Sequence, residues 1–434
     1  MPPKQHNQMG QNLRYLTPSK VPNLSTTDSL PYVKQPLQPE YTTEHAFDGA
    51  PFGDVRRYLS NKGVDLSLIY WGQVMANVTG GMHKKQDYAS QETISTNFDM
   101  NKLLGWENTS IILRTDQRAG RSLGTDALGD SMFTPAQIYG GGGNVIQKLV
   151  YFYLQKTFLK ERLRWIIGRY AVGPDYDFSL LGCTFSNVTI CGQPRLTTQL
   201  AGYASSPGSA WGSNLKFRPT PDSYIAIGLY NSNSKKGGTA GTNWYQSDGL
   251  VTAAEFGWEP QLGEDRLMGH WKAGILYDTS GYNYNDVSLD RKHGELLNYI
   301  AFDQMLVRNG KFESTGVILM GGWGHSTESI SPLAEQDYVG LIDYGQIKSR
   351  PLDGFGIYWW RYRYGKNFPA FYQPQNMSGR TLMATEQSGI ELTYRIRVVQ
   401  GVYFSPDYQY AWRPGGTGKI RNASIIGFDM RVWL

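Results

Sequence analysis

The sequence has no long apolar run and is poor in charge. No segment approaches the roughly 20 consecutive apolar residues of a membrane-spanning helix. Charged residues make up 18% of the 434 positions, below the roughly 25% of a typical soluble domain. Glycine (50) and tyrosine (29) are abundant instead, and the mean hydropathy is -0.43. Any membrane span must therefore be built from strands.

Cysteine is also scarce, because Cys183 and Cys191 are the only two. They flank the short stretch TFSNVTI. A loop of this length in an oxidising compartment favours a local disulfide, and two free buried thiols are the alternative.

The first part of the chain is rich in proline and has the composition of a tail. Residues 1–45 hold seven of the 21 prolines, so we expect residues 1–53 to form a disordered periplasmic tail. No apolar core of a signal peptide is present in MPPKQHNQMGQNLRYL, and we expect that a leader was removed or that the numbering starts after it. The segment DVRRYLSNKG at 54–63 predicts a short helix, which opens a second unit at 54–434.

From Val64 onward, apolar residues recur with a period of two, which indicates strands rather than helices. In GIELTYRIRVV, for example, Leu392 and Ile396 share one face, whereas Glu391 and Arg395 lie on the other. About sixteen such segments follow one another: 64–78, 92–104, 109–118, 147–156, 162–170, 209–218, 223–231, 250–258, 268–278, 297–305, 313–323, 337–346, 354–364, 387–399, 402–412 and 424–434.

The connections between these segments alternate in length. Those after odd-numbered segments are long and rich in Gly, Asn and Ser, such as NSKKGGTAGTNWYQSDG, and those after even-numbered segments are short, such as RPTPD. Long loops on one side and short turns on the other are typical of a barrel in the bacterial outer membrane. The sequence therefore predicts an all-β fold, a transmembrane antiparallel β-barrel of about 16 strands.

In such a barrel, residues alternate between lipid and a watery lumen. The closing segment SIIGFDMRVWL places apolar residues on one side and Asp429 and Arg431 on the other. Guanidinium, carboxylate and amide groups could bind sugar hydroxyls, and an aromatic ring could cover a pyranose; a generic polar wall is the alternative. The expected pore-lining residues are Arg114, Asp116, Arg118, Trp359, Arg361, Arg363, Glu391, Arg395, Arg397, Asp407, Gln409 and Arg431.

Several stretches resemble the carbohydrate-selective porin family, the OprB type, of Gram-negative outer membranes. They include LSNKGVDLSLIYWGQVMANVTGG, LKERLRWIIGRY and SRPLDGFGIYWWRYRYG, and the resemblance is most specific in the last fifty residues. It implies a sixteen-stranded barrel that passes glucose and related sugars by diffusion. The positions that match family motifs are Glu391, Tyr394, Arg395, Pro406, Asp407, Gln409, Tyr410, Pro414 and Gly415.

The sequence gives little support to other functions. The six histidines show no metal-binding spacing, and YGGGGN at 139–144 lacks the lysine of a phosphate-binding loop. We therefore expect no enzyme activity, cofactor or metal. The dispersed basic residues argue against nucleic acid. The expected partners are a carbohydrate, outer-membrane lipid and lipopolysaccharide, and the barrel-assembly machinery, with the chain as a monomer or homotrimer. The alternatives are a general diffusion porin, a barrel adhesin or a barrel enzyme.

Overall fold

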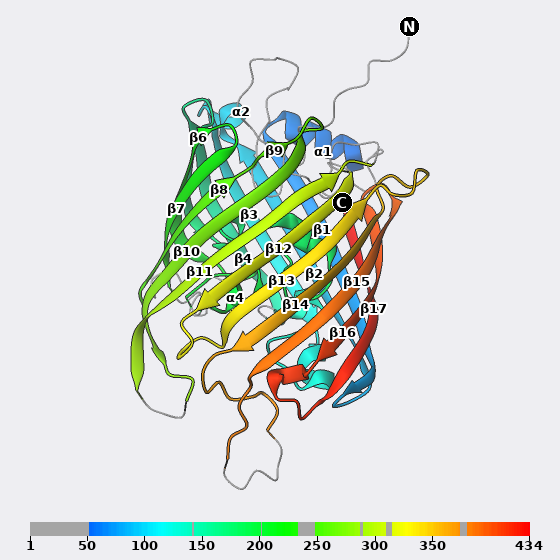
Figure 1. The fold of residues 1–434 in the computed structure, drawn as a ribbon. Helices are drawn as coiled ribbons and strands as arrows, with labels where there is room; N and C mark the ends of the chain where they lie inside the picture. The colour runs from blue at the N-terminus through cyan, green and yellow to red at the C-terminus, as the bar shows by residue number, and fades with distance from the viewer. Residues whose placement is uncertain are drawn as a thin grey trace.

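The computed structural model describes residues 52–140, 143–200, 202–232, 248–286, 290–309, 315–373 and 380–434. Within these ranges, sixteen antiparallel strands close into a barrel (Figure 1). They are β1 (Val64–Gly81), β2 (Lys85–Asp99), β3 (Thr109–Gly120), β4 (Val145–Phe158), β5 (Leu163–Tyr170), β6 (Ala210–Thr220), β7 (Ser223–Asn231), β8 (Leu250–Trp258), β10 (Leu267–Asn283), β11 (Arg291–Val307), β12 (Gly316–Ser326), β13 (Leu333–Tyr344), β14 (Gly354–Tyr364), β15 (Glu386–Val399), β16 (Val402–Trp412) and β17 (Arg421–Trp433).

The first strand closes the barrel by pairing on both sides. Gln73 of β1 faces Ala89 of β2 and also Asp429 of β17. The two-residue β9 (Gln261–Leu262) pairs only with β10 and extends a turn. The predicted fold class is confirmed, although the first two strands are longer than expected and only residues 82–84 connect them.

One end of the barrel carries the two-residue turns at 221–222 and 400–401, the helices α1 (Phe52–Asn61) and α2 (Met100–Leu104), and the C-terminus (Figure 1); the short connection at 82–84 lies at the other end. Short turns face the periplasm in outer-membrane barrels, so this end is periplasmic. Helix α1 agrees with the predicted helix at 54–63, whereas the predicted tail at 1–53 lies almost wholly outside the described residues. Among the residues that the structure describes, no helix is long and apolar enough to cross a membrane.

Strand β7 shows how the sequence pattern builds the wall. Its residues Ile225, Ile227 and Leu229 are exposed on the outside, whereas Tyr224 and Tyr230 are buried inside. Because successive side chains of a strand point to opposite faces, this alternation gives an apolar outer surface for lipid and an inner surface with polar tips.

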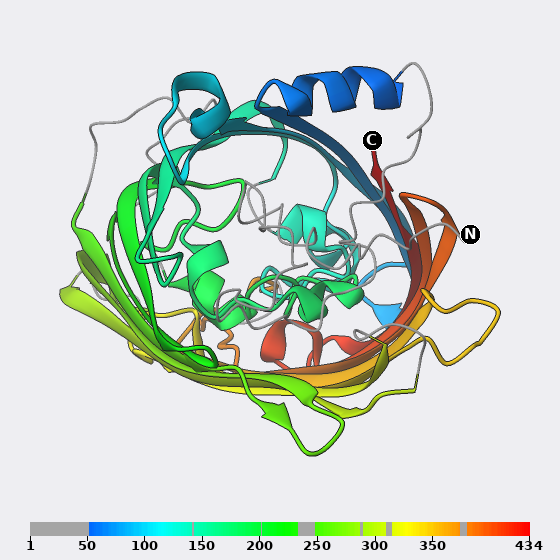
Figure 2. The same cartoon turned by 90° about the horizontal axis from the view of Figure 1, so that it is seen from above.

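Two connections at the extracellular end fold into the barrel instead of outward. Figure 2 shows their short helices inside the ring of strands. We call the described residues of 121–144 and 171–209 the inner segments. They contain η2 (Gly124–Leu128), α3 (Gln137–Gly140), η3 (Gly173–Asp175), η4 (Leu180–Thr184) and α4 (Arg195–Gln199), while η6 (Pro414–Gly416) lies between β16 and β17.

Aromatic rings join the inner segments to the wall. Phe133 stacks on Trp360 with ring centroids 4.7 Å apart, and Phe185 packs against Tyr358 at 4.3 Å. All four side chains are almost completely buried. The inner segments are therefore packed parts of the lumen, which leaves only part of the barrel cross-section open to solutes.

Candidate functional site

Two charged side chains of β15 bind the second inner segment. Arg395 donates from Nη2 to the carbonyl oxygen of Cys183 at 2.6 Å. The carboxylate of Glu391 accepts hydrogen bonds from the backbone N–H groups of Ser186 and Asn187. Glu391 and Arg395 are 0% and 1% exposed. Because a buried polar group is costly unless it is hydrogen-bonded, these contacts fix the position of the segment.

Glutamine side chains of the wall add further anchors. Gln73 donates to the carbonyl oxygen of Ser186 at 2.9 Å and accepts from the N–H of Ile138 at 3.0 Å, so it contacts both inner segments. Gln409 donates to the carbonyl oxygen of Pro135 at 3.0 Å. The amide satisfies donors and acceptors together, which suits it to holding a folded backbone.

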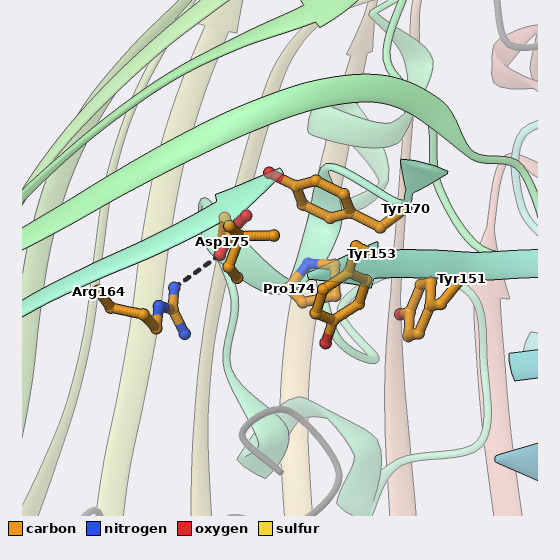
Figure 3. Close-up of a pocket in the computed structure, with 7 residues that line it drawn as sticks. Tyr151, Tyr153, Arg164, Tyr170, Pro174 and Asp175 are labelled. Atoms are coloured by element: carbon orange, nitrogen blue, oxygen red, sulfur yellow. Dashed lines mark hydrogen bonds and ion pairs between the residues drawn. The ribbon is translucent and has the colours of Figure 1, made fainter. Parts of the chain in front are cut away.

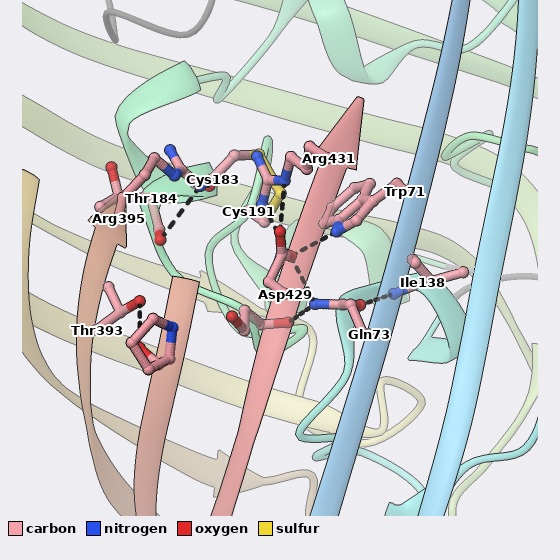
Figure 4. A network of polar contacts seen from close by, with 12 residues as sticks. Trp71, Gln73, Ile138, Cys183, Thr184, Cys191, Thr393, Arg395, Asp429 and Arg431 are labelled. Carbon is pink, nitrogen blue, oxygen red and sulfur yellow. Dashed lines mark hydrogen bonds and ion pairs between the residues drawn. A yellow bond between two sulfur atoms is a disulfide. The ribbon is translucent and has the colours of Figure 1, made fainter. Parts of the chain in front are cut away.

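A disulfide between Cys183 and Cys191 closes the turn that Arg395 and Glu391 hold (Figure 4). The predicted pairing is therefore confirmed. The disulfide lies within the inner segment at 171–209, and both cysteines are buried.

Most of the predicted pore-lining residues lie on the inner face of the barrel. Several of them are engaged with protein groups. Arg118, for example, donates to the side-chain oxygen of Gln91 and to the carbonyl oxygen of Ile138. The inward-facing members are Arg114, Asp116, Arg118, Glu391, Arg395, Arg397, Asp407, Gln409 and Arg431. Whether any of them contacts a sugar stays a prediction.

Two of these arginines are paired with a neighbour on their own strand. Arg114 forms a two-pronged contact with Asp116, at 2.9 Å for each nitrogen. Arg431 pairs with Asp429 at 3.0 Å and lies over the Trp71 ring, 4.1 Å from its centroid (Figure 4). The guanidinium groups of Arg114 and Arg431 are therefore both engaged by protein groups.

The predicted inward position of Trp359, Arg361 and Arg363 is wrong. On β14 the alternate residues Tyr358 and Trp360 face the interior, where Tyr358 donates to Asn187 of the inner segment at 2.6 Å. Trp359, Arg361 and Arg363 therefore lie on the outer face. The bulky rings fill the space beside the inner segments, so the charged residues take the other side.

The outward arginines form an ion-pair cluster near the extracellular end of the barrel. Arg361 pairs with Glu335 at 2.9 Å and with Asp337 at 2.6 Å. Arg363 pairs with Glu328 at 2.8 Å and with Glu335 at 3.2 Å. The cluster begins one residue from the end of β14, at the level where an outer-membrane barrel meets lipid head groups and charge is tolerated.

A pocket lies between the inner segment at 171–209 and the wall formed by β4 and β5 (Figure 3). Its cavity volume is about 20 Å³, so the pocket is a narrow gap between the inner segment and the wall. Arg164 on β5 donates to Asp175 of the inner segment at 2.8 Å and so joins the two sides of the pocket. The lining residues are Tyr151, Tyr153, Arg164, Ile166, Tyr170, Pro174 and Asp175.

The rings of the pocket form a contiguous and largely buried aromatic cluster. The centroids of Tyr151 and Tyr153 are 5.7 Å apart, and those of Tyr153 and Tyr170 are 5.3 Å apart. Asp175 also accepts from the hydroxyl of Tyr230 at 3.1 Å. Burial raises the pKa of Asp175, and the guanidinium of Arg164 opposes that rise. A carboxylate, a guanidinium and aromatic rings thus meet in one place.

The period of two also marks the strand residues of this pocket, which were not among the predicted site residues. Tyr151 and Tyr153 are two residues apart, as are Arg164 and Ile166, so each pair shares a face of its strand. Asp175 could not be assigned, because its position depends on the folding of the inner segment into the lumen.

A closed barrel with an apolar outer wall, a polar lumen and inward-folded connections defines a channel-forming porin. A model of the family described as carbohydrate-selective porin, OprB family, matches residues 83–433. The chain belongs to this family.

Similar proteins agree with this assignment. Porin B of Pseudomonas aeruginosa is 26% identical over 420 residues, which cover 88% of this chain and 90% of that protein. The high-pH structure of Pseudomonas putida OprB superimposes with a TM-score of 0.81 at 21% identity, covering 88% of this chain and 97% of that one. The low-pH structure of the same protein gives a TM-score of 0.59 at 18% identity. The chain is thus an outer-membrane porin of the carbohydrate-selective type, and the family and the barrel point to a channel rather than an enzyme.

Proposed function

We propose that the barrel admits glucose-like monosaccharides and small oligosaccharides by passive diffusion, and that the tyrosine pocket contacts them on the way. The observation that carries the proposal is the Arg164–Asp175 pair beside three tyrosine rings. A guanidinium and a carboxylate match the donors and acceptors of vicinal hydroxyls, and ring faces cover the C–H side of a pyranose.

The other predicted residues have two roles in this proposal. Glu391, Arg395 and Gln409 act as positioning residues, because their polar atoms hold the inner segments. Arg114 and Asp116 belong to the wall next to the pocket, since Arg114 lies 5.1 Å from the centroid of the Tyr151 ring. A solute site of a channel should bind weakly enough to release its ligand, so each contact is modest.

Liposome swelling with sugars and amino acids of matched size tests the proposal. We expect sugars to enter faster than amino acids of equal size. Equal rates would favour the alternative, a general diffusion porin without a sugar site. Hydrolysis of a lipid substrate by the purified barrel would instead favour a barrel enzyme, and binding of a host surface would favour an adhesin.

The remaining partners are part of the same proposal. The outer ion-pair cluster around Arg361 suits contact with lipopolysaccharide head groups. The barrel-assembly machinery and the choice between monomer and homotrimer stay predictions. Cross-linking in native outer membranes distinguishes the two oligomeric states.

A further inference from the structure

Two helices outside the barrel wall carry exposed apolar side chains at the periplasmic end. Figure 2 shows α1 and α2 outside the ring of strands. Phe52 is 71% exposed and Tyr58 63% exposed on α1, while Leu104 and Trp106 are 61% and 50% exposed on and after α2. We call this group the periplasmic ledge: Phe52, Val55, Tyr58, Leu103, Leu104 and Trp106.

We propose that the periplasmic ledge lies in the periplasmic leaflet of the outer membrane and is covered by phospholipid. The inference depends on the barrel lying in the outer membrane and not on the solute that it passes. The directions in which the faces of α1 point support this proposal.

Helix α1 has three faces, because residues at i, i+3 and i+7 share one side of a helix. One stripe is apolar, one contacts the barrel and one is polar. The barrel-facing stripe contains the buried Gly53 and the half-buried Arg56 and Ser60. The stripes are Phe52, Val55 and Leu59; Gly53, Arg56 and Ser60; and Asp54, Arg57 and Asn61, and Tyr58 lies between the apolar and the polar stripe.

The contact with the barrel fixes where the other two stripes point. They flank the barrel-facing stripe on opposite sides, and the helix lies at the periplasmic rim (Figures 1 and 2). One of the two therefore points toward the bilayer and the other toward the periplasm. The apolar stripe matches the lipid-facing surface of the barrel in character, whereas Asp54 and Arg57 pair with each other on the polar side, so we assign the apolar stripe to the bilayer.

Hydrogen bonds fix α2 beside α1. The N–H of Asp99 donates to the carbonyl oxygen of Gly63 at 2.8 Å, and Nζ of Lys102 donates to the carbonyl oxygen of Ser60 at 2.5 Å. Asp99 also caps α2, which ends at Gly105 with φ of 74°. The two helices thus form one surface with basic side chains at its edge, as in interfacial helices that bind phospholipid.

Spin labels test the inference in the complete porin. Both native cysteines are in the disulfide, so an introduced cysteine is the one free thiol among the described residues. Val55→Cys and Leu103→Cys report on the ledge, and Asn61→Cys is the matched control on the polar stripe. Each labelled variant is reconstituted in phospholipid vesicles, where collision with oxygen reports lipid and collision with a water-soluble nickel complex reports water.

We expect the labels at 55 and 103 to collide at least severalfold more with oxygen than with nickel, and the label at 61 to show the reverse. Equal access of nickel to all three labels would overturn the proposal, because the ledge would then face water. Spin–spin broadening at 55 or 103 would also overturn it, since a second copy of the chain would then cover the ledge. Correct folding is checked by ion conductance, which does not depend on the solute.

Discussion

The guanidinium of Arg395 on strand β15 donates to the carbonyl oxygen of Cys183, so a charge of the barrel wall holds the disulfide-closed turn of the inner segment. The neighbouring Glu391 binds the next backbone N–H groups of the same turn. The wall and the disulfide together therefore determine how far the segment extends across the lumen.

Replacing Arg395 with methionine should loosen the inner segment while leaving the barrel intact. The carbonyl oxygens of Cys183 and Thr184 would lose a charged donor. A hydrogen bond to a charged group contributes about 1.5–3 kcal/mol. We therefore expect the free energy of unfolding to fall by about that amount. Single-channel conductance should rise. The outward Arg363→Met is the control, and an unchanged conductance for Arg395→Met would count against the anchoring role.

Reduction of the disulfide between Cys183 and Cys191 should increase fluctuations of the open-channel current. The two cysteines are eight positions apart, and closing so short a loop contributes roughly 2–3 kcal/mol. The strand pairing does not involve this loop, so the barrel should persist on heat-modifiability gels. The double variant Cys183→Ser and Cys191→Ser should behave like the reduced protein. Quiet currents in both would show that Glu391 and Arg395 hold the turn by themselves.

Asp177 should make the second inner segment sensitive to pH. Burial raises the pKa of Asp177 from 3.8 to about 8, opposed by hydrogen bonding from Thr197 and by the charge of Lys272. The folded chain therefore keeps a proton that the unfolded chain releases. The stability contribution of this group falls as the pH rises from about 4 to about 8 and then levels off.

Current recordings at pH 6 and pH 9 check this expectation. At pH 9 the charged Asp177 lies near Glu255, which accepts from the Asp177 N–H at 2.8 Å, so the segment should fluctuate more. In Asp177→Asn the difference between the two pH values should shrink. A pH response that persists in this variant would assign it to another group.

Removing the outward arginines should leave sugar transport unchanged. Arg361 and Arg363 pair with Glu335 on the outer face, away from the lumen. Exposed ion pairs contribute up to about 1 kcal/mol, so stability should change little. Arg361→Ala and Arg363→Ala should both show the sugar block of the ion current found in the parent protein. A weaker block would place these side chains in the solute path after all.

The sequence predicts the strands well, because the period of two survives in almost every spanning segment. It does not always say which face is inside. On β14 both faces carry aromatic rings, so Trp359 and Trp360 could not be told apart by alternation alone. The contacts that hold the inner segments were beyond prediction for a related reason: the partners of Glu391 and Arg395 are about 200 residues away in the chain. Non-local packing decides such contacts.

The central claim is that the pocket between the inner segment and β5 contacts the sugar, and two variants test it directly. Arg164→Gln combined with Asp175→Asn removes both charges and keeps a polar group at each position, so neither partner is left as a buried, unpaired charge. Tyr153→Leu removes a ring from the aromatic surface and serves as a second variant.

Block of the ion current by glucose in planar bilayers, compared between the parent protein and these variants, is the decisive measurement. Loss of one or two charge-assisted hydrogen bonds should weaken the block by roughly ten- to hundredfold, with ion conductance retained. Glucose should block the ion current through the Arg361→Ala control as strongly as it blocks the current through the parent protein. Unaltered glucose block in both pocket variants would contradict the proposed sugar contact. The pocket would then be only a part of the barrel wall.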